Sequence, residues 1–131
     1  MSQKKEYEDI PGTYVFDADR SREGYHINMF CISLSKAANR ATFQADEPTY
    51  LDAYPMTDAQ RQSVLDRDWN EMLRLGGNVY YTSKLAANDG INFQQLAALM
   101  TGMSSDGYRK MMVDGGRSID GNRFKSEWED K

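Results

Sequence analysis

Apolar residues follow two stripes along residues 25–34, and both stripes have helical spacing. The first has the i, i+3, i+4, i+7 period of one helix face and consists of Ile27, Phe30, Cys31 and Leu34. The second lies beside it and consists of Tyr25, Met29 and Ile32. A helix that is apolar around most of its girth lies at the centre of its domain or is covered by another chain. The pattern therefore predicts a central helix.

Two shorter helical segments are expected after this helix. Residues 37–45 are rich in alanine, and Asp46 follows them as a candidate N-cap, with Pro48 in the first turn of the next helix. We expect that second segment to run through Tyr54.

Residues 57–75 carry the clearest helical signal. Thr57 and Gln60 have the spacing of a capping box at the start, and Gly76 is placed to end the helix. The apolar face between them consists of Leu65, Trp69, Met72 and Leu73. We predict one continuous helix over this range.

Three more helices are predicted from caps and stops in residues 78–116. Their candidate N-caps are Asn78, Asn92 and Ser104 or Ser105. Their stops are the Asp89–Gly90 turn, Gly102 and the Gly115–Gly116 pair. No segment alternates apolar and polar residues for long enough to predict a strand. The expected fold is all-α, a small orthogonal bundle of about six short helices.

The pattern divides the chain into three parts. Residues 1–20 have no sustained period and are expected to form an extended N-terminal arm. Residues 21–116 are expected to form the helical domain. Residues 117–131 are charged and aperiodic, so we expect a mobile tail unless Phe124 or Trp128 finds a groove on a partner.

Composition and charge limit the possible partners and compartments. The chain has 131 residues and a formal net charge of -4, so it lacks the basic surface that binds nucleic acid. No stretch approaches the roughly 20 apolar residues of a membrane span, and the N-terminal residues lack the apolar region of a secretory signal. Cys31 is the only cysteine, which excludes an internal disulfide and fits a reducing cytoplasm.

Side chains with catalytic chemistry are scarce. A 2-His-1-carboxylate metal site needs two imidazoles, and the chain has only His26. A catalytic triad could use His26, but no nucleophile-elbow motif accompanies it, so we expect a structural histidine rather than a self-sufficient hydrolase or metalloenzyme. Gly76 and Gly77 could cradle an anion at a helix start, but their spacing matches no phosphate-binding loop and favours a turn.

Methionine and aromatic residues are more numerous than one small core needs. There are 8 Met, 8 Tyr, 5 Phe and 2 Trp, and such residues are favoured at adaptable interfaces. Two interpretations stay open: the residues either fill gaps between short helices or face a partner chain. The question applies to Met100, Met103, Met111 and Met112.

Six ordered motifs, spread over roughly residues 9–118, give the chain a family resemblance. They read DIPGTYVFDADRSREGYHINMF, F-x-A-D-E-x-x-Y-L-D, GGNVYYTSKL, DGINFQ, MTGMSSDGY and MMVDGGRS. Together they resemble the small (alpha) subunit of protocatechuate 4,5-dioxygenase, of the LigAB-type extradiol ring-cleavage dioxygenases. Related small subunits or fused domains belong to dioxygenases of gallate and other catechols.

The resemblance implies a non-catalytic role for this chain. In that family a non-haem Fe(II) is held by two His and a Glu of the larger, beta subunit. The enzyme uses O2 to cleave the catecholic ring beside its hydroxyls, so protocatechuate (3,4-dihydroxybenzoate) gives 4-carboxy-2-hydroxymuconate semialdehyde. The small subunit is a helical cap over the site. We therefore expect no cofactor in this chain, Fe(II) in its partner, and a heterodimer or a higher assembly of such pairs.

The resemblance also suggests residues near the substrate entrance. Phe93 follows the Asp-Gly turn at a predicted helix start, where its ring would face the partner's pocket or, alternatively, the core of its own domain. Asn92, Tyr80 and Tyr81 are further candidates for this entrance. No residue is expected to be catalytic or to bind a metal.

A different class of function also fits the pattern. An independent helical adaptor or small-molecule-binding module could use the same scaffold without an iron-bearing partner, because fold does not fix function. The sequence does not decide between protocatechuate, gallate and other catechol acids, nor does it give the number of heterodimers.

Overall fold

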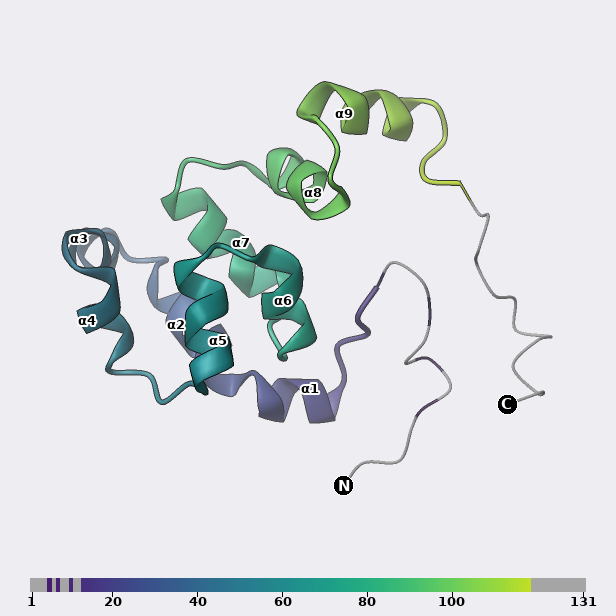
Figure 1. Ribbon diagram of the computed structural model, residues 1–131. Coiled ribbons are helices and arrows are strands. Elements are labelled where there is room, and N and C mark those ends of the chain that lie inside the picture. The colour runs from purple at the N-terminus through teal and green to yellow at the C-terminus, as the bar shows by residue number, and fades with distance from the viewer. Residues whose placement is uncertain (1–4, 6, 8–9, 11–12, 119–131) are drawn as a thin grey trace.

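The computed structural model describes residues 5, 7, 10 and 13–118 of the chain, and over these residues the fold is all-α, as predicted. The described part contains nine helices and no strand. Their bounds are α1 Ala18–Glu23, α2 Tyr25–Ser33, α3 Ala37–Ala45, α4 Glu47–Leu51, α5 Asp58–Leu65, α6 Trp69–Arg74, α7 Val79–Asn88, α8 Phe93–Thr101 and α9 Ser105–Val113. In Figure 1 the α3–α4 pair lies at one end of the molecule and the α8–α9 pair at the other.

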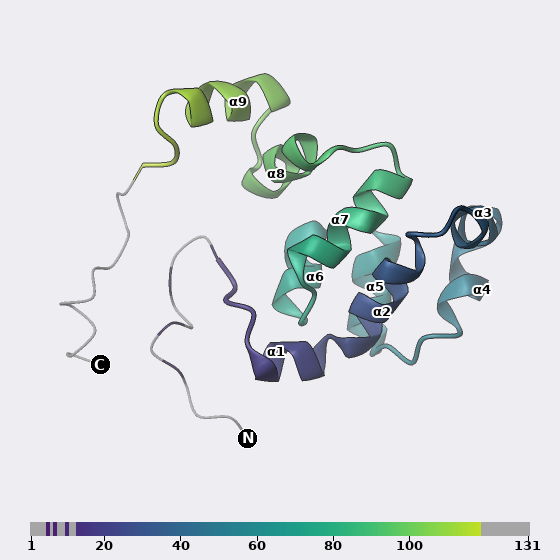
Figure 2. The same cartoon turned by 180° about the vertical axis from the view of Figure 1, so that it is seen from behind.

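The hydrophobic core is centred on α2, as its first apolar stripe predicts. Ile27, Phe30 and Cys31 are fully buried, and α2 packs along α7 (Figure 2). The second stripe is only partly covered, because Tyr25 is 55% and Ile32 39% exposed. An aromatic cluster joins this core to α3 and α4 and consists of Phe30, Phe43, Tyr50 and Tyr54.

Two buried amide side chains join the start of α2 to the turn between α6 and α7. Asn28 donates from Nδ2 to the carbonyl of Gly76 at 3.2 Å, and its Oδ1 accepts from the backbone N–H of Asn78 at 2.9 Å. Gln60 donates from Nε2 to the carbonyls of Glu23 at 2.9 Å and Leu75 at 3.0 Å. These bonds provide partners for backbone groups at helix ends, which have no partner within their own helix.

Most of the predicted caps are confirmed. Thr57 and Gln60 form the capping box of α5, and the side chain of Asn78 accepts a backbone N–H at the start of α7. Asn92 forms a second capping box, with Gln95. Ser104 caps α9. Asp46 caps α4, with Pro48 in the first turn.

The single helix predicted over residues 57–75 is wrong, because the structure has two helices there. Arg67 has a φ of 53°, the only positive φ at a non-glycine residue in the described part of the chain. This left-handed residue ends α5, and Asp68 then caps α6 by accepting from the N–H of Glu71. The break and the unpredicted α1 account for much of the difference from the expected six helices.

Three other predictions about element limits differ from the structure or lie outside it. α1 begins at Ala18, inside the stretch predicted as extended, with Asp17 as its N-cap. α4 ends at Leu51 and does not run through Tyr54. Phe124 and Trp128 of the predicted tail lie outside the described residues. No helix in the described part is long and apolar enough to cross a membrane.

Candidate functional site

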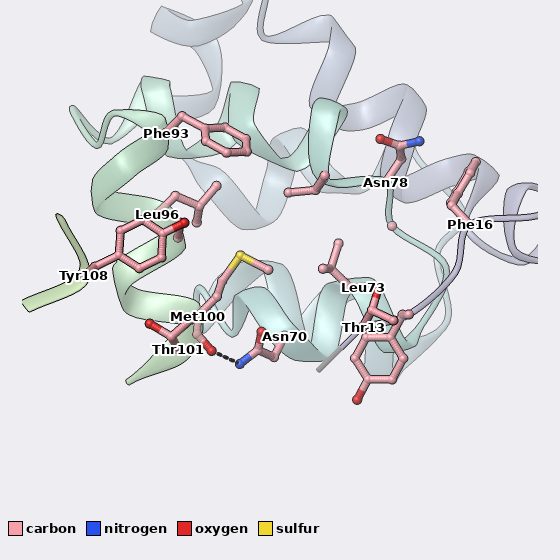
Figure 3. Close-up of a pocket in the computed structure, with 14 residues that line it drawn as sticks. Thr13, Phe16, Asn70, Leu73, Asn78, Phe93, Leu96, Met100, Thr101 and Tyr108 are labelled. Atoms are coloured by element: carbon pink, nitrogen blue, oxygen red, sulfur yellow. Dashed lines mark hydrogen bonds between the residues drawn. The ribbon is translucent and has the colours of Figure 1, made fainter. Parts of the chain in front are cut away.

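A cavity of about 670 Å³ lies between α8 on one side and α6 with the start of α7 on the other (Figure 3). Residues of the N-terminal arm and Tyr108 of α9 complete its wall. The lining residues are Thr13, Tyr14, Phe16, Asn70, Leu73, Gly77, Asn78, Val79, Phe93, Leu96, Ala97, Met100, Thr101 and Tyr108.

Phe93 lines this cavity from the first position of α8. The capping box of Asn92 and Gln95 fixes the helix start immediately before it, with both hydrogen bonds at 2.8 Å. The Phe93 side chain is 59% exposed, so it does not belong to the core of this domain. Of the two interpretations in the sequence, the structure therefore excludes an ordinary core aromatic.

The other three predicted entrance residues do not line the cavity. Asn92 uses its side chain to cap α8. Tyr80 is 64% exposed, with the Lys84 amine 5.0 Å from its ring centroid. Tyr81 lies edge-on to Tyr80, with ring centroids 5.7 Å apart, and packs against the core. The structure thus places Tyr80 and Tyr81 together on α7, outside the lining of the cavity but next to Val79, which lines it.

The sequence reasoning missed most of the cavity wall. The sequence predicts Leu73 on an apolar helix face and leaves Met100 open between core and interface, and Figure 3 shows both side chains directed toward the cavity. Asn70 donates from Nδ2 to the carbonyl of Met100 at 2.9 Å, which holds α6 beside the end of α8. Thr13 and Phe16 come from the aperiodic arm. The apolar run at residues 14–16 is the one signal in the arm that could have indicated packing against the helices.

The four methionines left open in the sequence do not form the core. Met112 is 53% exposed, and Met103 and Met111 are half-buried. Met100 is also half-buried, since it packs against the core cluster from the cavity side. No residue of α9 is buried.

Uncharged side chains make up the described lining of the cavity. Among the described residues that line it there is no Asp, Glu, Lys, Arg or His, so none of them is a cation that could pair with a carboxylate. Tyr14 and Tyr108 are the lining residues of a type that can take part in proton transfer. Aliphatic, aromatic, amide and hydroxyl groups are suited to the face and edge of an uncharged ring.

Side chains able to bind iron do not assemble in the described residues. No group of three or more His, Cys, Asp or Glu side chains is arranged there to hold a metal ion. His26 lies half-buried on α2, with its ring edge-on to Tyr25 at 5.2 Å. Cys31 is fully buried, and this burial raises the pKa of its thiol well above the usual range, against a smaller opposite effect of Arg67. These residues do not fit a non-haem iron site.

A cluster of polar side chains ties residues 5 and 7 to the start of α1. The Lys5 amine lies 2.7 Å from Asp17 and 2.8 Å from Asp19, and the Tyr7 hydroxyl donates to Asp17 at 2.5 Å. Hydrogen bonds from Lys5 and Tyr7 lower the pKa of the Asp17 carboxyl well below its usual range. Thr13, Tyr14 and Phe16, which precede Asp17 closely in the chain, line the cavity.

Charged residues are rare in the part of the chain that forms much of this site. Residues 75–103 include only Lys84 and Asp89 as charged side chains, and Asp89 is paired with Arg67. The exposed large apolar residues of this range are Val79, Tyr80, Phe93 and Leu99. Exposed Tyr14, Val15 and Phe16 of the arm add to them. Apolar exposure of this extent is typical of an interaction surface.

Residues 27–113 match the family model described as the aromatic-ring-opening dioxygenase LigAB, LigA subunit. The chain belongs to this family. The match runs from the central helix α2 to the end of α9, so it includes Phe93 and the helical wall of the cavity. The family resemblance read from the six motifs is confirmed.

One relative of the chain is the gallate dioxygenase of Pseudomonas putida. It is 24% identical to the LigA-family chain over 103 residues, which are 79% of this chain but 30% of the relative. The chain therefore spans less than a third of that relative's length.

Proposed function

We propose that this LigA-family chain is the non-catalytic small subunit of a non-haem Fe(II) extradiol dioxygenase of the cytoplasm, and that it caps the active site of a separate large subunit. The observation that carries the proposal is the exposed ring of Phe93 in a cavity whose described lining is uncharged. In a chain of this family, such a residue is suited to the wall of a shared entrance. The iron ligands would come from the large subunit, since the described residues of this chain do not provide them.

The proposed substrate is protocatechuate or a related catechol acid such as gallate. The motif resemblance supports protocatechuate, and the name of the Pseudomonas putida relative supports gallate. Either substrate carries a carboxylate, and the described residues that line the cavity include no cation to bind it. We therefore assign recognition of the carboxylate to the large subunit. The small subunit would contact the aromatic ring through Phe93 and the aliphatic wall behind it.

The cap would act by excluding water rather than by proton transfer. A closed apolar entrance strengthens electrostatic interactions inside the site and protects reactive intermediates from water. The exposed apolar residues of α7, α8 and the arm would then be covered by the large subunit, in a heterodimer or a higher assembly. Burying them would remove from water the patch that the isolated chain exposes.

Co-expression with a large-subunit reading frame tests the proposal. The chain should co-purify with a larger subunit that contains iron, and oxygen uptake with protocatechuate or gallate should require both chains. Each chain alone, and the mixture of separately purified chains, serve as controls. Failure to co-purify with any large subunit would favour the independent adaptor. Iron-dependent ring cleavage by the small chain alone would contradict the non-catalytic assignment.

A further inference from the structure

Arg67 joins three separate parts of the fold through one side chain. Its guanidinium binds both carboxylate oxygens of Glu47 at 3.0 and 2.7 Å, and both of Asp89 at 2.6 and 3.2 Å. The fifth bond goes to the carbonyl of Val64 at 2.8 Å. All five N–H donors of the guanidinium therefore have an acceptor. The group also lies 5.5 Å from the ring centroid of the buried Phe43.

The backbone of Arg67 indicates that this arrangement is imposed by its partners. A left-handed conformation is disfavoured for any residue with a Cβ, and it persists where surrounding contacts determine it. The side chain is only 21% exposed, and those of Glu47 and Asp89 are 32% and 23% exposed. Lysine could not replace it, because an ammonium has three donors and no planar fork.

One of these contacts bears on the position of Phe93. Asp89 is the C-cap of α7, and only the turn of residues 90–92 separates it from Phe93. That turn is short and hydrogen-bonded, since the N–H of Ile91 donates to the carbonyl of Ala86 at 2.9 Å. A shift of the Asp89 carboxylate would therefore move the start of α8.

The same segment holds the other end of α8. Asn70 follows Arg67 by three residues and donates to the carbonyl of Met100 at 2.9 Å, as Figure 3 shows. Arg67 thus acts near the first turn of α8 and Asn70 near its last turn. The Asn70 bond joins α6 directly to α8, and the Arg67 bond joins the same segment to the turn before α8.

We infer that the Arg67–Asp89 ion pair is a positioning element of the cap, which holds the α7–α8 turn so that Phe93 faces the cavity. Neither residue lines the cavity, so the pair acts on a bound substrate only through Phe93 and α8. The positioning of α8 is a property of this chain alone. Its effect on catalysis rests on the proposed function.

Hydrogen exchange on the isolated chain tests the positioning role. Asp89→Asn keeps the size of the side chain but removes its charge, and Asp52→Asn removes the separate Arg61–Asp52 pair as a matched control. We expect Asp89→Asn to accelerate exchange of the Ile91, Gln95 and Leu96 amides about tenfold, with α2 unchanged. Unchanged exchange at these amides, or equal acceleration across all helices, would overturn the inference.

A second variant distinguishes the effect of the Arg67 guanidinium from the effect of the left-handed backbone at this position. Arg67→Gly relieves the left-handed strain while it removes every ion pair of the side chain. We expect the same local acceleration as in Asp89→Asn. If Arg67 served only to break the helix, Arg67→Gly would leave the exchange of α8 unchanged, and the positioning role would be wrong.

Steady-state kinetics of the assembled enzyme test the link to Phe93. Asp89→Asn should shift KM for the aromatic acid about three- to tenfold in the direction seen for Phe93→Ala, with kcat nearly constant. In a Phe93→Ala background it should have little further effect. If the KM shifts of Asp89→Asn and Phe93→Ala were additive, Asp89 would not act on the substrate through Phe93. If exchange changes as expected while neither substitution affects KM, the entrance role of Phe93 fails and the positioning of α8 stands.

Discussion

Gly24 and Gly76 lie in direct backbone contact at the junction of α1 and α2 with the α6–α7 turn. A Cβ placed on Gly24 would lie 1.8 Å from the carbonyl oxygen of Gly76. The carbonyl that leaves no room for this Cβ also accepts the hydrogen bond from Asn28. The two segments can therefore approach only if position 24 has no side chain.

Gly24→Ala should lower the free energy of unfolding by about 3 kcal/mol, because backbone atoms must move to admit the methyl group. Denaturation in urea measures the change. Gly102→Ala is the matched control, since its Cβ meets nothing within 4 Å and only its φ of 72° is unfavourable. The control should cost about 1 kcal/mol. Equal losses in the two variants would contradict the close contact.

Asn28→Ala should destabilise the fold by about 2–3 kcal/mol, because it leaves the buried carbonyl of Gly76 and the N–H of Asn78 without partners. Asn39→Ala is the comparison, since Asn39 is half-buried and makes one bond, to the carbonyl of Ser33. Thermal unfolding of both variants gives the difference. A loss for Asn28→Ala no larger than that for Asn39→Ala would mean that water replaces the missing bonds.

Phe93→Ala should leave stability within about 0.5 kcal/mol of the parent, because its ring is mostly exposed. In the assembled enzyme it should change kcat/KM for protocatechuate or gallate by about 1–3 kcal/mol, the range for one apolar contact. Phe43→Ala removes a fully buried ring and should cost about 3–5 kcal/mol of stability. Melting curves beside oxygen-uptake kinetics separate the two. An early-melting Phe93→Ala with parental kinetics would contradict the entrance role.

The contact of Lys5 and Tyr7 with Asp17 should survive mild acid. The pKa of Asp17 is lower in the folded than in the unfolded chain. The contribution of the ionised Asp17 to the stability of the fold is therefore fully present above the pKa of the unfolded chain, about 3.9. That contribution is lost only as pH falls through the lower folded pKa. NMR titration should find Asp17 still ionised at about pH 3, where an ordinary Asp is mostly protonated. Asp17→Asn is the control, and protonation of Asp17 near pH 4 would contradict the contact.

Local signals were enough to predict most of the helices. Thr57 with Gln60, Asn92 as an N-cap, and Gly102 act within one or two turns, so their roles can be read from spacing. The break at Arg67 could not be predicted in this way. Its acceptors Glu47 and Asp89 lie about twenty residues away on either side, and tertiary contacts of this kind override helix propensity.

The candidate site was predictable only in part, for a similar reason. Phe93 follows a recognisable turn and cap, and its position at a helix start was therefore expected. The arm residues that face it, among them Tyr14 and Phe16, belong to a segment without periodicity. They lie next to Asp17, whose contacts with Lys5 and Tyr7 no local pattern indicates.

The scarcity of charge in residues 75–103 determines how a complex formed through this surface should respond to its surroundings. Arg67 is paired with both Asp89 and Glu47, so the charges that this stretch could offer to a partner are Lys84 and the single excess negative charge of this mostly covered ion-pair cluster. Association would gain little from electrostatic steering and would change little with ionic strength. Because apolar area would be removed from water, titration calorimetry should give a negative heat-capacity change. Such a complex would weaken on cooling rather than on addition of salt.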